Sequence, residues 1–211
     1  MSEEDFAAMR AAMVASQLRP SDVNDPAVLA AMAEVPREDY VPAARRETAY
    51  VDRPIPLGNG RAMNAPLATG RLLDVAQIRP GDKVLLIGDS TGYTATLLAH
   101  MGAVVTAVGE GEKPAQLPES VKWVGMFPAK GGKESGSYDV LLIDGAVPEL
   151  PAALTAQVAE DGRLAFGLVQ NGVTRLCSGR KAGGSIGFSR LHDIEMVLVP
   201  GLMPEDVGFV F

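Results

Sequence analysis

Residues 83–109 read KVLLIGDSTGYTATLLAHMGAVVTAVG, and this stretch decides the fold class. Its first part, 83–88, is a short apolar run without alternation, which is typical of a strand covered on both faces of a parallel sheet. The segment 94–101 has a helical pattern and stops at Gly102, a residue that commonly ends helices. A second apolar run, 103–108, follows at once. This order of strand, helix and strand predicts an α/β fold with a mostly parallel sheet.

The same alternation continues toward the C-terminus. A helix is expected at 151–161 and a turn at Gly183-Gly184, and further strands are expected at 121–125, 138–144, 163–169, 174–177, 193–199 and 207–211.

The first forty residues predict helices instead. Ser2 with Asp5 predicts a cap for the first helix, and Asp25-Pro26 predicts the start of the second. Residues 36–68 contain five prolines and predict a long irregular segment, a kind that is often functional. The architecture we expect is a doubly wound sheet with an N-terminal helical cap.

Composition narrows the function classes. The 211 residues carry 19 Lys and Arg against 26 Asp and Glu, so the net charge of −7 argues against a nucleic-acid partner. The single cysteine, Cys177, excludes an internal disulfide and leaves no thiol cluster for zinc, and its apolar neighbours predict a small buried side chain. The N-terminus is acidic and lacks a signal-peptide pattern, and no apolar stretch approaches the roughly 20 residues that span a bilayer. We therefore expect a cytoplasmic protein without a membrane partner.

The turn in VLLIGDSTGYTATLLA (84–99) is the first candidate for chemistry. Ligands of open parallel sheets bind at the carboxyl ends of strands, and Gly88 and Gly92 bracket such a turn. The helix that follows is expected to present unpaired N–H groups there. The sequence GDSTG lacks the middle glycine of a G-x-G-x-G pattern, so the turn alone does not identify the ligand.

Longer segments do identify a family. The chain resembles the protein-L-isoaspartate O-methyltransferases along nearly its whole length, in the segments 13–42, 49–66, 79–99, 138–154 and 160–172. Members of that family methylate isoaspartyl carboxylates in damaged proteins with S-adenosylmethionine. The resemblance implies a doubly wound sheet of the S-adenosylmethionine-dependent methyltransferase type and a protein or peptide substrate. It also implies a single methyltransferase-like domain over 1–211, with 1–78 as helical cap and active-site segment and 79–211 as α/β core.

The resemblance also implies the site residues. The family's active-site stretch, Thr-Ile-Ser-x-Pro, matches residues 62–66, so Asn64 stands in place of the catalytic serine and Pro66 closes the motif. The Asn64 amide offers donors to a substrate carboxylate but no hydroxyl. The implied cofactor-binding residues are Gly88, Asp89, Ser90, Gly92, Tyr93, Glu110 and Asp144. No metal site is expected.

Several cofactor positions depart from the family pattern. Leu86 replaces an acidic residue, and Ser90 replaces a loop glycine. The second strand, which ends in a ribose-binding acid in the family, is followed here by Gly109, and Glu110 comes one position late. The segment that follows is too short for a crossover helix of about 10–12 residues, and Met126-Phe127 stands where the family carries Asp-Gly near the adenine. These changes leave open a non-catalytic relative whose remodelled cleft binds a protein partner.

A serine hydrolase is the remote alternative. Residues 88–92 fit G-x-S-x-G, and Asp144 and His192 follow Ser90 in the order of an α/β-hydrolase triad. That fold needs several strands before its nucleophile, whereas residues 1–82 predict helices and proline-rich loop. The oligomeric state stays open.

Overall fold

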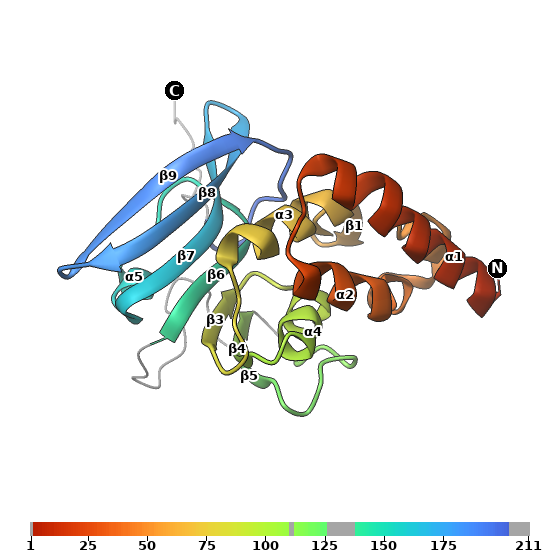
Figure 1. The fold of residues 1–211 in the computed structure, drawn as a ribbon, viewed down its shortest axis with the longest axis horizontal. Coiled ribbons are helices and arrows are strands. Elements are labelled where there is room, and N and C mark those ends of the chain that lie inside the picture. The colour runs from red at the N-terminus through yellow and green to blue at the C-terminus, as the bar shows by residue number, and fades with distance from the viewer. Residues whose placement is uncertain (1, 110–111, 126–137, 203–211) are drawn as a thin grey trace, which may run out of the picture.

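A seven-stranded sheet forms the centre of the molecule (Figure 1). The computed structural model describes residues 2–109, 112–125 and 138–202. The strand order across the sheet is β5 (Lys122–Gly125), β4 (Val104–Gly109), β3 (Lys83–Ile87), β6 (Tyr138–Val147), β7 (Val158–Gln170), β8 (Val173–Ala182) and β9 (Ser185–Asp193). The strands from β5 to β7 run parallel, and β8 and β9 are antiparallel additions. The predicted α/β fold with a mostly parallel sheet is confirmed.

Burial on both faces explains the apolar runs of the central strands. In β3, Val84 and Leu86 point into a core shared with the N-terminal helices, while Leu85 and Ile87 point into a second core on the opposite face. Successive side chains of a strand alternate between faces, so a strand with a core on each side carries apolar residues at consecutive positions. The covered-strand interpretation of 83–88 is therefore confirmed.

Four helices lie on one side of the sheet. They are α1 (Glu3–Met13), α2 (Pro26–Glu34), α3 (Pro66–Ala76) and α4 (Tyr93–His100), and each supplies buried side chains to the same core. Helices α3 and α4 contact the strands, and α1 and α2 pack outside them. The opposite face receives Leu154 of the short α5 (Ala152–Thr155) and side chains from residues 199–202. The helical cap and both predicted starts are confirmed, since Ser2 forms a capping box with Asp5 and Asp25 caps α2.

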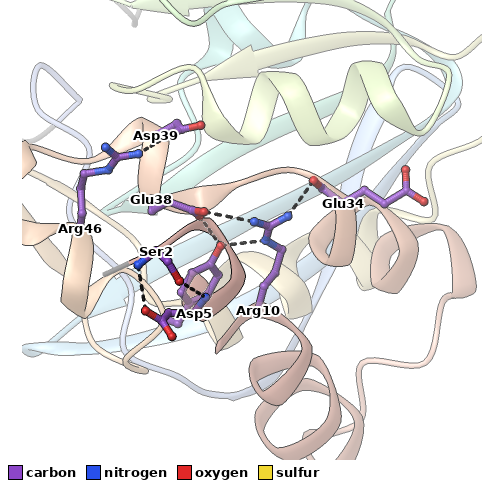
Figure 2. Close-up of polar contacts among 8 residues, drawn as sticks. Ser2, Asp5, Arg10, Glu34, Glu38, Asp39 and Arg46 are labelled. Atoms are coloured by element: carbon purple, nitrogen blue, oxygen red, sulfur yellow. Dashed lines mark hydrogen bonds and ion pairs between the residues drawn. The ribbon is translucent and has the colours of Figure 1, made fainter. Parts of the chain in front are cut away.

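A polar cluster fastens the cap to the segment that follows it. Figure 2 shows Arg10 reaching from α1 toward Glu34 and Glu38. Its guanidinium donates to the Glu34 carbonyl, to the Glu38 carboxylate at 3.1 Å and to the Tyr50 hydroxyl at 2.9 Å. The Tyr50 hydroxyl in turn donates to Glu38. These contacts fix the course of residues 37–50 against α1.

Two C-terminal predictions were wrong. Only 152–155 of the predicted helix 151–161 is helical, because Val158 already pairs with Tyr138 in the sheet. Tertiary pairing overrides local helix preference here. The predicted strand 193–199 forms only an isolated bridge between Leu198 and Ala146, and the edge strand is β9 instead. The left-handed Gly183-Gly184 turn is confirmed. The predicted strand 207–211 lies outside the described residues.

The proline-rich segment is more regular than predicted. A hairpin of β1 (Ile55–Gly58) and β2 (Arg61–Met63) follows two short 3₁₀ helices, Arg37–Tyr40 and Ala43–Thr48. Helix α3, which the sequence analysis missed, begins at Pro66. Proline favours the first position of a helix, and this was the available signal. Within the described ranges, no helix has the length and hydropathy that a bilayer crossing requires.

Candidate active site

The turn after β3 is organised by a buried carboxylate. Gly88 and Gly92 have φ of +92° and +86°, a region that favours glycine, so the two predicted turn residues are confirmed as a glycine-dependent bend. The Asp89 carboxylate between them accepts hydrogen bonds from the amides of Thr91, Gly92 and Ala95 at 2.8–3.1 Å. The expectation of unpaired N–H groups was wrong for these amides, since Asp89 caps α4 from within the chain.

A second buried carboxylate, Asp144, lies near the carboxyl end of β6. It accepts from Thr94 Oγ1 at 2.7 Å and from Asn64 Nδ2 at 2.8 Å. Asn64 Oδ1 accepts the amide of Val197 at 2.8 Å, so both ends of this amide have partners in the protein. Asn64 is only 2% exposed. Asn64 therefore links Asp144 to residues 194–200, which we call the C-terminal strap.

The C-terminal strap closes over the strand ends. The Val197 carbonyl and the Val199 amide bond to Ala146 at 2.7 and 3.1 Å. A Cβ atom added at Gly88 would lie 3.2 Å from the Val199 methyl groups, and one at Gly145 would lie 2.6 Å from the Val197 carbonyl. The strap thus forms a fixed wall beside the glycine turn.

Arg37 is a buried cation behind this wall. It is fully buried, and it donates to the carbonyls of Ala49 and Asn64. Its guanidinium lies 5.1 Å from the centre of the Tyr93 ring, which also packs edge-on against Tyr40. Nη1 of Arg37 has no hydrogen-bond partner among the described residues, and neither has the Tyr93 hydroxyl. Burial raises the pKa of Tyr93 to about 12.

Both buried carboxyls have raised pKa values. Burial, and then the charge of Asp144, raise the pKa of Asp89 to about 6, and burial also raises the pKa of Asp144. Hydrogen bonds from Thr94 and Asn64 and the nearby charge of Arg37 oppose the shift at Asp144. Because its pKa is about 6, Asp89 is mostly ionised at neutral pH and places a negative charge beneath the turn, which favours a cationic ligand group.

The Asp89→Asn variant tests this electrostatic arrangement. Because the pKa of Asp89 is raised to about 6 from 3.8, the folded chain binds this proton more tightly than the unfolded chain. The carboxyl's stabilising contribution is complete below its ordinary pKa and is lost as the pH rises through about 6. Between about pH 4 and pH 7, the free energy of unfolding of the wild type should fall relative to the variant by about 2–3 kcal/mol. Urea titrations at both pH values measure this difference, and parallel pH dependences in the two proteins would contradict it.

A cleft of about 310 Å³ opens at the carboxyl ends of β3 and β4. Its volume is at the lower end for ligand pockets. It is bordered by the glycine turn, the β1–β2 hairpin, the segment after β4 and the strap, through Asn59, Arg61, Gly88, Asp89, Ser90, Gly109, Glu112, Pro114, Trp123, Val199 and Pro200. A second cavity of about 280 Å³ shares Arg61, Ser90 and Pro114 with it. The Arg61 guanidinium between them makes no hydrogen bond or ion pair with another described residue.

The described residues after β4 contain no crossover helix, as predicted. Residues 112–121, as far as they are described, contain only turns. Pro114 and Leu117 pack toward Gly92, where an added Cβ would lie 3.4 and 3.2 Å from their side chains. Glu110 and Met126-Phe127 lie outside the described residues, whereas Glu112 borders the cleft.

Only some of the predicted site residues border the cleft. Gly88, Asp89 and Ser90 border the cleft, while Asn64, Gly92, Tyr93 and Asp144 are buried behind it. Pro66 is buried at the start of α3. Leu86 is fully buried in the core. Sequence reasoning missed Arg37, Arg61, Thr94, Trp123 and Val199. No local sequence pattern marked these residues, because Arg37 stands in an ordinary charged stretch beside Glu38 and Asp39.

The hydrolase alternative is not supported by the geometry. His192 lies on β9, where both ring nitrogens contact Arg71 of α3. Ser90 Oγ contacts the Gly88 carbonyl, and Asp144 bonds to Asn64 and Thr94. In the described part of the chain, no hydrogen bond joins any two of Ser90, Asp144 and His192. The described residues also contain no group of three or more His, Cys, Asp or Glu side chains placed to hold a metal ion. Cys177 is buried, as predicted.

Comparison with known proteins assigns this arrangement to a family. Residues 9–201 match the model of the protein-L-isoaspartate(D-aspartate) O-methyltransferase family. The protein-L-isoaspartate O-methyltransferase of Koribacter versatilis is 34% identical over 205 residues, which cover 93% of this chain and 92% of the relative. That of Gloeobacter violaceus is 37% identical over 161 residues, or 72% and 78% of the two chains.

Solved structures agree with the fold. A Plasmodium falciparum protein described as a protein-L-isoaspartate O-methyltransferase, in complex with S-adenosyl-L-homocysteine, superposes with a TM-score of 0.75. It is 21% identical, and the match covers 91% of this chain and 98% of that one. A second protein-L-isoaspartate O-methyltransferase gives a TM-score of 0.77 at 19% identity, covering 92% and 67%.

Proposed function

The chain belongs to the protein-L-isoaspartate(D-aspartate) O-methyltransferase family, and we propose that it methylates isoaspartyl carboxylates of damaged proteins with S-adenosylmethionine. The observation that carries the proposal is the cleft at the ends of β3 and β4, which adjoins a second cavity across Arg61. Two adjoining spaces are what a cofactor and a peptide side chain require. We also propose a cytoplasmic location for this activity.

The residues of the cleft fit the cofactor. The backbone of Gly88–Ser90, together with Trp123 and Glu112, would hold it, and the cleft offers both an aromatic surface and polar groups. When bound, S-adenosylmethionine supplies a methyl group on a positively charged sulfur. The Asp89 carboxylate, whose pKa of about 6 leaves it mostly ionised at neutral pH, provides a negative charge that favours this cation.

The chain's own part in the reaction is positioning. A carboxylate is already a nucleophile at neutral pH, so no general base is needed, and alignment in a water-poor site supplies much of the acceleration. We propose that Arg61, whose guanidinium is unpaired among the described residues, binds the substrate carboxylate from the second cavity. Asn64 holds the C-terminal strap against Asp144, and Pro66 fixes the start of α3 behind it.

A methyl-transfer assay tests the proposed function. Purified protein is incubated with S-adenosylmethionine labelled in the methyl group and with an isoaspartyl peptide or the same peptide containing normal aspartate. We expect label in the isoaspartyl peptide at a rate at least about tenfold above the aspartyl control, because rates follow differential transition-state binding. Binding of the cofactor without transfer to either peptide would instead support the non-catalytic relative, which no observation on the described residues favours.

An Arg61→Gln variant belongs in the same assay. It removes the charge while keeping hydrogen-bond donors, so KM for the peptide should rise about tenfold or more with a smaller change in kcat. An unchanged KM would remove Arg61 from the proposed substrate site and leave the methyltransferase activity itself standing.

A further inference from the structure

The end of β4 has no side chain where the family pattern places a ribose-binding acid. That position is Gly109, and the indole of Trp123 fills the space beside it. A Cβ atom added at Gly109 would lie 2.4 Å from Cη2 of Trp123, with Cζ2 and Cζ3 at 3.2 and 3.3 Å. A carboxylate side chain at 109 and the present position of the indole therefore exclude each other.

Trp123 is also part of the cleft wall. It lies on β5, opposite Ala107 of β4, and it borders the same cleft as Gly88 and Ser90. The indole is half-buried, and its Nε1 is buried without a hydrogen-bond partner among the described residues. Packing against Gly109, not a hydrogen bond, therefore sets the position of the ring.

Among the described residues, two carboxylates border the cleft, and neither stands at the end of β4. Asp89 borders the cleft, but its oxygens accept hydrogen bonds from two amides of the glycine turn and one amide of α4. Glu112 also borders the cleft, but it is exposed on the segment after β4. The half-buried indole of Trp123 is thus the bulky side chain at the point where strands β4 and β5 meet the cleft.

We propose that Trp123 determines how the adenosine end of the cofactor is recognised, by stacking against the adenine in place of carboxylate hydrogen bonds to the ribose hydroxyls. The inference rests on the proposed function, because it assumes an adenosine ligand in this cleft. An aromatic ring offers a stacking surface to any base and makes no hydrogen bond to the ribose hydroxyls. Recognition in this protein accordingly depends on the base and only slightly on the ribose.

Binding measurements test the proposal directly. S-adenosylhomocysteine is titrated calorimetrically into the wild type, Trp123→Phe and Trp123→Ala. Loss of stacking should weaken binding by about 10- to 100-fold in Trp123→Ala, whereas Trp123→Phe should stay within about fivefold of the wild type. Trp123 is the single tryptophan of the chain, so intrinsic fluorescence of the wild type should be quenched or shifted on binding. Circular dichroism melting identifies any variant that fails to fold.

A double variant supplies the matched test. Gly109→Asp with Trp123→Ala introduces the acid and removes the ring that blocks it. The 2′-deoxyribose analogue of S-adenosylhomocysteine should bind the wild type within about threefold of the parent compound. It should bind the double variant about tenfold or more weakly than the parent, since a hydrogen bond to a charged group is lost. Gly109→Asp alone should weaken binding, because the two side chains collide.

The outcomes separate this inference from the proposed function. If S-adenosylhomocysteine does not bind the wild type at about 1 mM, both fail, because that affinity corresponds to negligible recognition of a cofactor of this size. If it binds the wild type and Trp123→Ala equally well, or if the wild type discriminates strongly against the 2′-deoxy analogue, the stacking role is overturned and the methyltransferase assignment stands. The wild-type analogue measurement decides this even where Trp123→Ala does not fold.

Discussion

Replacing Asn64 with aspartate should lower the free energy of unfolding at pH 7 by about 3–5 kcal/mol, because it places an uncompensated charge in a buried site. The Asn64 amide nitrogen lies 2.8 Å from an oxygen of Asp144, and both residues are buried. A second carboxylate would remove that hydrogen bond and set two like charges in contact. The deficit should shrink at pH 5, where the two carboxyls can share a proton. Urea unfolding at both pH values measures it.

A charge swap makes this prediction specific. In the double variant Asn64→Asp with Asp144→Asn, the amide donates from position 144 to a carboxylate at 64, which still accepts the Val197 amide. We expect at least half of the lost stability to return. The matched control is Asn171→Asp at an exposed turn, which should change stability by less than about 0.5 kcal/mol. A loss of stability in Asn64→Asp as small as in this control would contradict the role of Asn64 in joining the C-terminal strap to Asp144.

The Arg37→Leu substitution should lower the free energy of unfolding by a similar amount, about 3–5 kcal/mol, as expected when one partner of a buried polar network is removed. Leucine would leave the carbonyls of Ala49 and Asn64 without their donor and Asp144 without its nearby cation. The pKa of Asp144, already raised by burial, should then rise further. Arg37→Lys keeps the charge but not the forked geometry, so its free energy of unfolding should lie between those of the wild type and Arg37→Leu.

Arg46 provides the comparison for this substitution. It lies in the neighbouring 3₁₀ helix and pairs with Asp39 on the surface, as Figure 2 shows. An exposed ion pair contributes little, so Arg46→Leu should cost less than about 1 kcal/mol. Equal losses of stability in Arg37→Leu and Arg46→Leu, measured by urea unfolding, would refute the role we assign to the buried guanidinium.

Local signals account for the parts of the fold that sequence reasoning predicted. The run from β3 to β4 was predicted because its strands are apolar on both faces and its turns carry glycines with positive φ. The starts of α1 and α2 were predicted because Ser2 and Asp25 cap within their own segments. Each of these signals is contained in a few neighbouring residues.

Features that depend on distant partners were not predicted. Residues 158–161 join β7 because Tyr138 pairs with Val158, and no local pattern encodes that pairing. Strand β9 carries mostly exposed side chains at the edge of the sheet, so it lacks an apolar run. The position of the C-terminal strap depends on Ala146 and Asn64, which are about 50 and 130 residues away in the chain.

The candidate site divides in the same way. The glycine turn was predicted from sequence, but the contacts of Asp89 with the amides of α4 were not. Asn64 was predicted from the resemblance as a donor to substrate, whereas its amide bonds to Asp144 and Val197. The meeting of Trp123 with Gly109 needed the register of β4 against β5.

The central claim is that the cleft at the ends of β3 and β4 binds S-adenosylmethionine. Calorimetric titration of the wild-type protein with S-adenosylmethionine and S-adenosylhomocysteine tests it most directly. The account predicts saturable one-to-one binding of both compounds with Kd values of about 1–100 μM, which correspond to roughly −8 to −5 kcal/mol. Absence of any binding heat at about 1 mM ligand, from a protein whose circular dichroism shows it folded, would contradict the claim.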